Sequence, residues 1–212
     1  DGARSAFEEA IRYSPSNADA HYRLGCALEE LGDVAGGIRQ YRKVIRLQAD
    51  HFGARERLGV ILFVDGDPHG AIREYRRALR SNPQSAFTHM ALGLALSVVS
   101  DAEGAIREYR ETIRLMPDHP SAHLFLGKKL FEIGEWDEAL VELREAVRIQ
   151  PEDPLAYYAL GISLKTMRQW REAAEAFRHY LDIVQSDQDN HDQRRVKRVE
   201  AFLRELTKKQ LI

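Results

Sequence analysis

The dipeptide Leu-Gly occurs five times in this chain of 212 residues, each copy 34 residues after the one before. The copies are Leu24-Gly25, Leu58-Gly59, Leu92-Gly93, Leu126-Gly127 and Leu160-Gly161. Self-similarity at a period of about 20 to 50 residues is typical of proteins built from one repeated supersecondary unit. Such a unit cannot bury its apolar face alone, so neighbouring units must stack and share a continuous core.

Further positions keep the same register. A leucine stands three residues after each glycine, at Leu28, Leu62, Leu96, Leu130 and Leu164. Farther along, a small residue recurs at Ala71, Ala105, Ala139 and Ala173, and a large one follows four residues later at Tyr75, Tyr109, Leu143 and Phe177. Prolines at Pro15, Pro83, Pro117 and Pro151 close the units, because a proline ends a helix at or before the preceding residue.

The full pattern, Leu-Gly-x-x-Leu, then Ala-x-x-x-aromatic, then Pro, resembles the tetratricopeptide repeat, a helix-turn-helix unit of this length. Gly37 replaces the expected alanine, and Ala49 and Gln185 replace the expected prolines. Trp is usual in the family at positions that are here His21, Arg55, His89 and His123. The resemblance implies an all-α, right-handed superhelical solenoid.

The helix chemistry agrees with that fold. A glycine within a helix lowers helix stability by about 1 kcal/mol relative to alanine. Its recurrence at one repeat position therefore indicates that the two helices approach closely there. The small alanine of the second helix is expected opposite. The expected turns carry Gly32, Gly66 or Gly134. The next residue is Asp33, Asp67, Asp101 or Glu135, and an acidic residue there is suited to cap the second helix, with Pro68 as a first helical residue.

These registers divide the chain into one solenoid domain. The predicted parts are a second half-repeat at 1–17, full repeats at 18–51, 52–85, 86–119, 120–153 and 154–187, and a capping helix at 190–212. Because Ala3, Phe7, Ala10 and Pro15 match only the second half of a repeat and no initiator Met precedes them, we expect the chain to be part of a longer protein.

The C-terminal segment is predicted to be a polar linker from Gln185 to Asp192 followed by a helix at about 191–210. Its apolar face would hold Val196, Val199, Phe202, Leu203 and Leu206, with basic residues elsewhere. Repeat arrays need such a helix to cover their open end. A basic amphipathic helix of this kind can instead contact a membrane or nucleic acid.

The resemblance implies that the first helices line a concave groove, which is the expected binding site. The candidate groove residues are Val60, Phe63, Phe87, Met90, Leu94, Val98, Leu124, Phe125, Lys128, Phe131, Tyr158 and Ile162. Large apolar side chains on an open surface indicate a binding site for an apolar or amphipathic peptide or helix. In the alternative interpretation they pack against neighbouring helices and the groove is narrow.

Two known ligand types of the family do not match. The clamp for a terminal carboxylate needs Lys, Asn and Arg where this chain includes Tyr22, Cys26, Arg57, Phe87 and Ala91. The asparagine ladder of the glycosyltransferase type is replaced by Arg23, Arg57, Ala91, Phe125 and Ala159.

A basic ladder follows the second helices. It comprises Arg39, Arg42, Lys43, Arg46, Arg73, Arg76, Arg77, Arg80, Arg107, Arg110 and Arg114. Residues 34–80 hold ten Lys/Arg against five Asp/Glu, whereas residues 115–153 hold four against nine. This face could attract an anionic partner or another copy of the chain, or be a solvated face with Glu74, Glu108 and Glu111 in helical ion pairs. Nucleic acid is a less favoured partner, because the net charge is −2 and no aromatic platform interrupts the arginines.

Catalytic and metal-binding motifs are not found in the sequence. It lacks a phosphate-binding Gly-x-x-x-x-Gly-Lys, a Gly-x-Ser-x-Gly and a His-Glu-x-x-His motif. Asp65-Gly-Asp-Pro-His-Gly70 begins like a calcium loop, but Arg76 occupies the position of the closing carboxylate. We therefore expect no enzyme activity, no cofactor, no metal and no small-molecule substrate.

The resulting prediction is a non-catalytic protein-interaction scaffold or adaptor. The alternative is a regulatory or targeting module of a larger enzyme or assembly machine. A third hypothesis is that the arginine ladder binds an anion or nucleic acid. No apolar run reaches the roughly 18 residues of a membrane span, and the single cysteine, Cys26, fits a reducing, cytoplasmic location. An open groove and a half-repeat would also allow self-association.

Overall fold

The computed structural model describes residues 2–186 and 193–212, and these residues form twelve α-helices and no strand. The all-α repeat fold predicted from the sequence is thereby confirmed. The chain divides into two compact units, Asp1–Leu115 and Met116–Ile212. Each unit is described by itself below.

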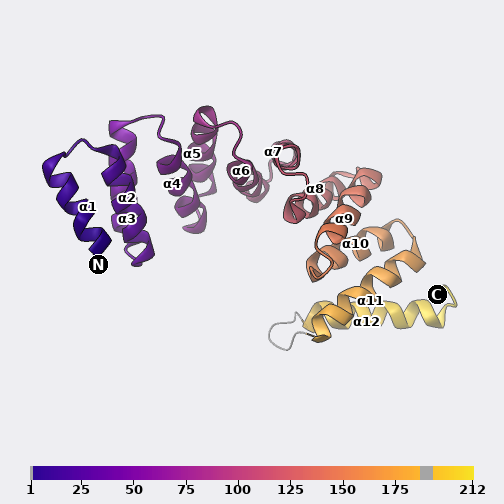
Figure 1. Ribbon diagram of the computed structural model, residues 1–212. Helices are drawn as coiled ribbons and strands as arrows, with labels where there is room; N and C mark the ends of the chain where they lie inside the picture. The colour runs from indigo at the N-terminus through magenta and orange to yellow at the C-terminus, as the bar shows by residue number, and fades with distance from the viewer. Residues whose placement is uncertain (1, 187–192) are drawn as a thin grey trace. The chain divides into compact units, whose positions relative to one another are not determined.

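The first unit contains one unpaired helix followed by three helix pairs (Figure 1). Its helices are α1 (Gly2–Tyr13), α2 (Ala18–Glu30), α3 (Val34–Leu47), α4 (Phe52–Val64), α5 (Pro68–Ser81), α6 (Ala86–Val98) and α7 (Ala102–Leu115). The helices α2, α4 and α6 are the first helices of their pairs, and each packs against the second helix that follows it. The first helices α4 and α6 also contact each other.

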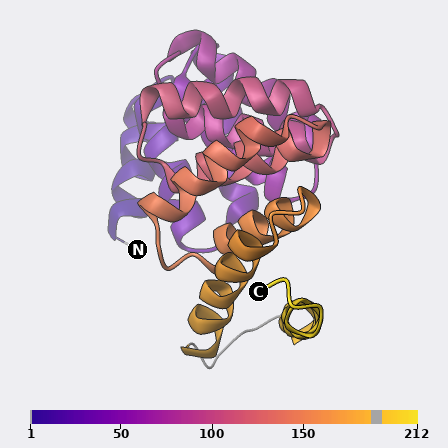
Figure 2. The same ribbon diagram turned by 90° about the vertical axis from the view of Figure 1, so that its right-hand side faces the viewer.

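The second unit contains two helix pairs and a final helix. Its helices are α8 (Pro120–Ile133), α9 (Trp136–Ile149), α10 (Pro154–Thr166), α11 (Trp170–Ser186) and α12 (Gln193–Lys208). The first helices α8 and α10 contact each other, and α12 packs against α11. In Figure 2, α12 is seen end-on while α11 runs across the view, so these two helices cross.

The second helices begin where the sequence predicts a cap. The carboxylates of Asp33, Asp67 and Asp101 accept hydrogen bonds of 2.8, 2.8 and 2.9 Å from backbone N–H groups three residues later. These bonds satisfy donors that a helix N-terminus leaves unpaired. Glu135 occupies the same position before α9 but makes no such side-chain bond; its longer side chain caps less well than aspartate. The turn glycine Gly134 adopts φ 90°, a conformation that side chains with a Cβ avoid.

Each Leu-Gly glycine marks the closest approach within a helix pair. A Cβ built on Gly93 would lie 2.6 Å from a ring carbon of Tyr109, which is fully buried. In the second unit, a Cβ on Gly127 would lie 2.7 Å from Leu143 and 3.0 Å from the backbone oxygen of Ala139. The glycine therefore allows a large core side chain of the second helix to pack directly onto the backbone of the first.

The C-terminal segment differs from its prediction in one respect. Helix α11 continues to Ser186, so Gln185 is helical and not part of a linker. Residues 187–192 of the expected linker lie outside the described residues, as does the expected helix start at residue 191. In α12, Val199, Phe202 and Leu206 are buried, in agreement with the predicted apolar face.

Candidate protein-binding surface

The three histidines that share one repeat position fasten the first helix of their own repeat. In His21, His89 and His123, one ring nitrogen is 3.0, 3.0 and 2.7 Å from the carbonyl oxygen of the proline six residues earlier. The other ring nitrogen is 2.7, 2.6 and 2.6 Å from a polar group nineteen residues later, on the second helix. Those groups are Gln40, Glu108 and Glu142. These side chains therefore link the first helix to the preceding turn and to the second helix through specific hydrogen bonds.

Arg55 occupies the same repeat position in the second full repeat and makes equivalent contacts. Its Nε donates to the carbonyl oxygen of Ala49 at 2.7 Å, and its Nη1 lies 2.6 Å from Glu74. Both side chains are nearly buried, with 8% and 11% of their surface exposed. Glu74 also pairs with Arg77 at 3.0 Å. A buried charge is tolerated only when it is paired in this way.

The environment raises the pKa of both His89 and His123. Burial of each ring lowers its pKa, but the hydrogen bond to Glu108 or Glu142, the bond to the proline carbonyl and the nearby carboxylate charges outweigh this effect. The charged imidazolium is thus favoured in the folded state. Each histidine interacts with its own glutamate, and the two do not come together in one site.

In the first unit, five of the candidate groove residues form a surface on α4 and α6, called here the first surface. Phe87 and Val98 are 58% and 61% exposed. Val60, Phe63 and Leu94 are half-buried. On α6, positions 87, 94 and 98 follow the spacing of one helix face.

In the second unit, five more candidates lie on α8 and α10, called here the second surface. Phe125, Phe131, Tyr158 and Ile162 are half-buried, and Lys128 is exposed. The Lys128 ammonium nitrogen is 5.3 Å from the centre of the Phe125 ring, a cation–π contact. The lone charge predicted in the groove is therefore held over an aromatic ring.

The remaining two candidates are core residues, and the expectation that they line an open groove is wrong. Met90 is 8% exposed and Leu124 is 4% exposed. Leu124 belongs to the same buried cluster as Leu140 and Ala156. Both residues stand at one repeat position, 34 residues apart, where stacking of neighbouring helices covers the side chain.

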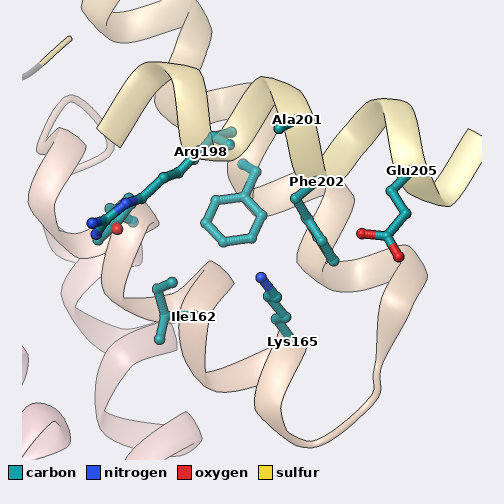
Figure 3. Close-up of a pocket in the computed structure, with 9 residues that line it drawn as sticks. Ile162, Lys165, Arg198, Ala201, Phe202 and Glu205 are labelled. Atoms are coloured by element: carbon teal, nitrogen blue, oxygen red, sulfur yellow. The ribbon is translucent and has the colours of Figure 1, made fainter. Parts of the chain in front are cut away.

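A pocket of about 460 Å³ lies between the second surface and α12. Figure 3 shows Ile162 and Lys165 of α10 on one side, with Arg198, Ala201 and Phe202 of α12 opposite. The Lys165 ammonium nitrogen is 4.5 Å from the centre of the Phe202 ring, and the Phe177 and Phe202 rings meet edge-on at 5.5 Å. The pocket thus combines aromatic walls with Lys165, Arg198 and Glu205 at its edge.

The site predicted from the sequence does not include four residues that line this pocket, namely Lys165, Phe177, Arg198 and Phe202. The amphipathic pattern of α12 identified Phe202 as apolar, but a helix pattern does not state which surface the helix covers. Lys165 falls one helix turn after Ile162 on α10, so the spacing along that helix was the available signal.

Residues 2–186 and 193–212 were also compared with the requirements of a metal site and of a membrane span. No group of three or more His, Cys, Asp or Glu side chains there is arranged to hold a metal ion. Within the same residues, no helix has both the length and the apolar character needed to cross a bilayer.

Comparison with known proteins identifies the repeat. Family models described as TPR repeat and tetratricopeptide repeat match residues 127–167, and residues 1–40 and 22–86, respectively. A comparison with curated proteins gave no match.

Solved structures with the same fold cover most of the chain. YrrB, described as a TPR protein with an unusual peptide-binding site, is 22% identical, with a TM-score of 0.80 over 87% of this chain and 95% of its own. MamA from Desulfovibrio magneticus RS-1 is 17% identical, with a TM-score of 0.75 over 81% and 97%. Pseudomonas aeruginosa PilF is 19% identical, with a TM-score of 0.70 over 92% and 91%. The repeat pattern, the helix pairs and the family models agree, and the chain belongs to the tetratricopeptide repeat family.

Proposed function

We propose that this chain is a non-catalytic scaffold that binds an apolar or amphipathic peptide or helix on the surfaces of its first helices. The observation that carries the proposal is the exposure of Phe87 and Val98 on α6, beside the half-buried Val60, Phe63 and Leu94. Phe87 and Val98 lie on one face of α6, and exposed apolar patches mark interaction sites in soluble proteins. The family consists of interaction modules, which supports the same conclusion.

A helical ligand is favoured because an amphipathic helix of this chain already lies beside the second surface. Helix α12 is amphipathic, and its Val199 and Phe202 line the same pocket as Tyr158 and Ile162. The chain therefore contains one example of an amphipathic helix that lies beside first-helix residues, with the pocket between them. An external helix with apolar residues at similar spacing would find comparable chemistry on the first surface, where Phe87 and Val98 are exposed.

The magnitudes agree with a modest affinity. Burying three or four large apolar side chains contributes roughly 5 to 10 kcal/mol. Association costs about 4 to 15 kcal/mol in lost freedom of motion. The most favourable balance of these ranges, about 6 kcal/mol, corresponds to a dissociation constant of roughly tens of micromolar, which suits a weak, exchangeable scaffold contact.

The test is a selection from a displayed library of random peptides, followed by affinity measurement with a double variant, Phe87→Glu with Val98→Glu. Both side chains are exposed, so the variant should fold, which circular dichroism would verify. We expect the wild type to enrich amphipathic sequences and the variant to lose their binding, because two carboxylates would need to be desolvated in the contact.

A matched control adds the same charge elsewhere. Met116 and Val141 are 50% and 62% exposed and lie outside both surfaces. The double variant Met116→Glu with Val141→Glu should bind the selected peptides like the wild type. Equal binding by all three proteins, or an equal loss in both variants, would contradict the proposal.

A further inference from the structure

We infer that a depression between α3, α4 and α5 of the first unit is a binding site for an oxyanion carrying at least two negative charges. The depression has a volume of about 400 Å³, within the range of small-ligand sites. It lies among second-helix residues of the arginine ladder and is formed by residues other than those of the first surface. The inference is therefore independent of peptide binding.

The charge of the depression is strongly unbalanced. Five arginines and two carboxylates line it, a formal charge of +3. The two carboxylates are already engaged. Asp67 caps α5 through the N–H of Gly70, and Glu74 binds Arg55 and Arg77.

Three of the lining arginines lack an acidic partner. Within the part of the chain that the structure describes, no carboxylate comes within 4.0 Å of the guanidinium groups of Arg42, Arg46 or Arg73. All three side chains are exposed at the rim. Glu74 forms the expected helical ion pair with Arg77 and also binds the buried Arg55, but this pairing leaves Arg42, Arg46 and Arg73 without an acidic partner among the described residues.

The walls add a second property. Ile45, Leu58 and Leu62 also line the depression, so its inner surface is partly apolar. Charges of one sign around a low-dielectric concavity focus the electrostatic field and raise the local concentration of anions. Guanidinium groups also present paired donors that match carboxylate and phosphate oxygens.

The next joint of the same unit provides an internal comparison. A shift of 34 residues converts the seven charged lining residues into Arg76, Arg80, His89, Asp101, Arg107, Glu108 and Glu111. That set has three arginines and three carboxylates, with Glu108 bound to His89 and Glu111 bound to Arg114. The excess positive charge belongs to the α3–α5 joint and is not a general property of the repeat.

The ligand chemistry follows from the charge and the donors. A phosphate monoester or diphosphate group would satisfy it, and so would two or three neighbouring carboxylates. The two sources share the requirement for several oxygens at fixed spacing around paired guanidinium donors.

The experiment is isothermal titration calorimetry at constant ionic strength with pyrophosphate and, separately, with tricarballylate. The test variant is Arg42→Gln with Arg46→Gln. Its control is Arg76→Gln with Arg80→Gln, which changes the same two repeat positions and the same net charge one repeat later. All four side chains are exposed, and circular dichroism would verify that both variants are folded.

We expect at least one probe to bind the wild type, with affinity at least about tenfold lower in the test variant and altered by no more than about twofold in the control. Binding of pyrophosphate alone would assign the site to phosphate groups, and binding of tricarballylate alone to clustered carboxylates. Absence of binding by both probes, or an equal loss in the two variants, would overturn the inference.

Discussion

The arginines on the second helices have different surroundings in the two units. On α9 of the second unit both arginines are paired: Arg144 lies 2.6 Å from Glu172, and Arg148 lies 2.7 Å from Glu145 and 3.4 Å from Asp118. In the first unit, Arg42, Arg46 and Arg73 line a depression, and no carboxylate among the described residues lies within 4.0 Å of their guanidinium groups. The second helix α9 thus carries arginines that are neutralised by carboxylates, whereas the depression between α3, α4 and α5 carries an excess of positive charge.

The first-helix surfaces differ as well. Tyr158 and Ile162 of the second unit share a pocket with α12, whereas Phe87 and Val98 of the first unit are more than half exposed. The repeat specifies the positions that stack, such as Gly93 against Tyr109, and these are alike in both units. Positions outside the stack are free to diverge, and they are where binding properties arise.

The largest expected effect sharpens the comparison of the two cores. The side chain opposite the repeat glycine is Tyr109 in the first unit and Leu143 in the second, and both are fully buried. We expect Tyr109→Ala to lower the free energy of unfolding by about 4 kcal/mol and Leu143→Ala by about 3 kcal/mol, because each leaves a cavity scaled to the lost side chain. Urea unfolding measures both. A smaller loss at Tyr109 than at Leu143 would show that the core of the first unit collapses around the vacancy.

The buried pair of the first unit gives the next effect. Arg55→Met would leave Glu74 nearly buried with only Arg77 as a partner, and we expect a loss of about 3 kcal/mol. Arg55→His should cost less, because histidine binds a carboxylate at this repeat position in His89 and His123. Thermal and urea unfolding of the two variants would compare them. Equal destabilisation would show that size, and not the ion pair, decides the residue at this position.

The pH dependence tests a device that both units share. Because the pKa values of His89 and His123 are raised in the folded state, their pairs stabilise the fold fully below the unfolded-state pKa of 6.5. That contribution is lost as the pH rises through the higher, folded-state pKa. Glu142→Gln would convert the pair of the second unit into the His–Gln pair seen at His21 and Gln40.

The measurement is the difference in unfolding free energy between wild type and Glu142→Gln as a function of pH. We expect the wild-type advantage to shrink as the pH increases above 6.5. Glu108→Gln should behave in the same way in the first unit. A difference that does not vary with pH would show that the histidines are neutral in the folded protein.

The smallest expected effect concerns the exposed ion pairs of the second unit. Arg144 and Glu172 are about half exposed, at 52% and 51%. Arg144→Ala should change the free energy of unfolding by no more than about 0.5 kcal/mol, because solvent screens such pairs. A loss above about 1 kcal/mol, measured by urea unfolding, would show that pairing contributes to the stability of this unit more than its exposure implies.

The fold could be predicted because its signals are local and repeated. Close helix packing can be predicted from Leu92-Gly93 and Tyr109. The start of a second helix can be predicted from Asp67 and Pro68. The exposure of two candidate groove residues, Phe87 and Val98, also agrees with their helix spacing.

The rest of the site depends on contacts that spacing does not specify. Met90 and Leu124 lie on the expected stripe, but neighbouring helices cover them. From the sequence, Glu74 could form an ion pair with any nearby arginine. Only the structure shows that it binds the buried Arg55. The position of α12 beside Ile162 is a tertiary contact between helices that no repeat pattern encodes.

The most direct test of the central claim is methyl NMR of the protein titrated with peptides selected from the library. Binding on the first surface predicts that the methyl signals of Val60, Leu94 and Val98 shift with the amount of peptide, while those of Val141, on the second helix α9, remain fixed. Shifts confined to Ile45, Leu58 and Leu62, which line the depression and lie outside the first surface, or no shift at Val60, Leu94 and Val98, would contradict the claim that this tetratricopeptide repeat protein binds its partners on the first surface.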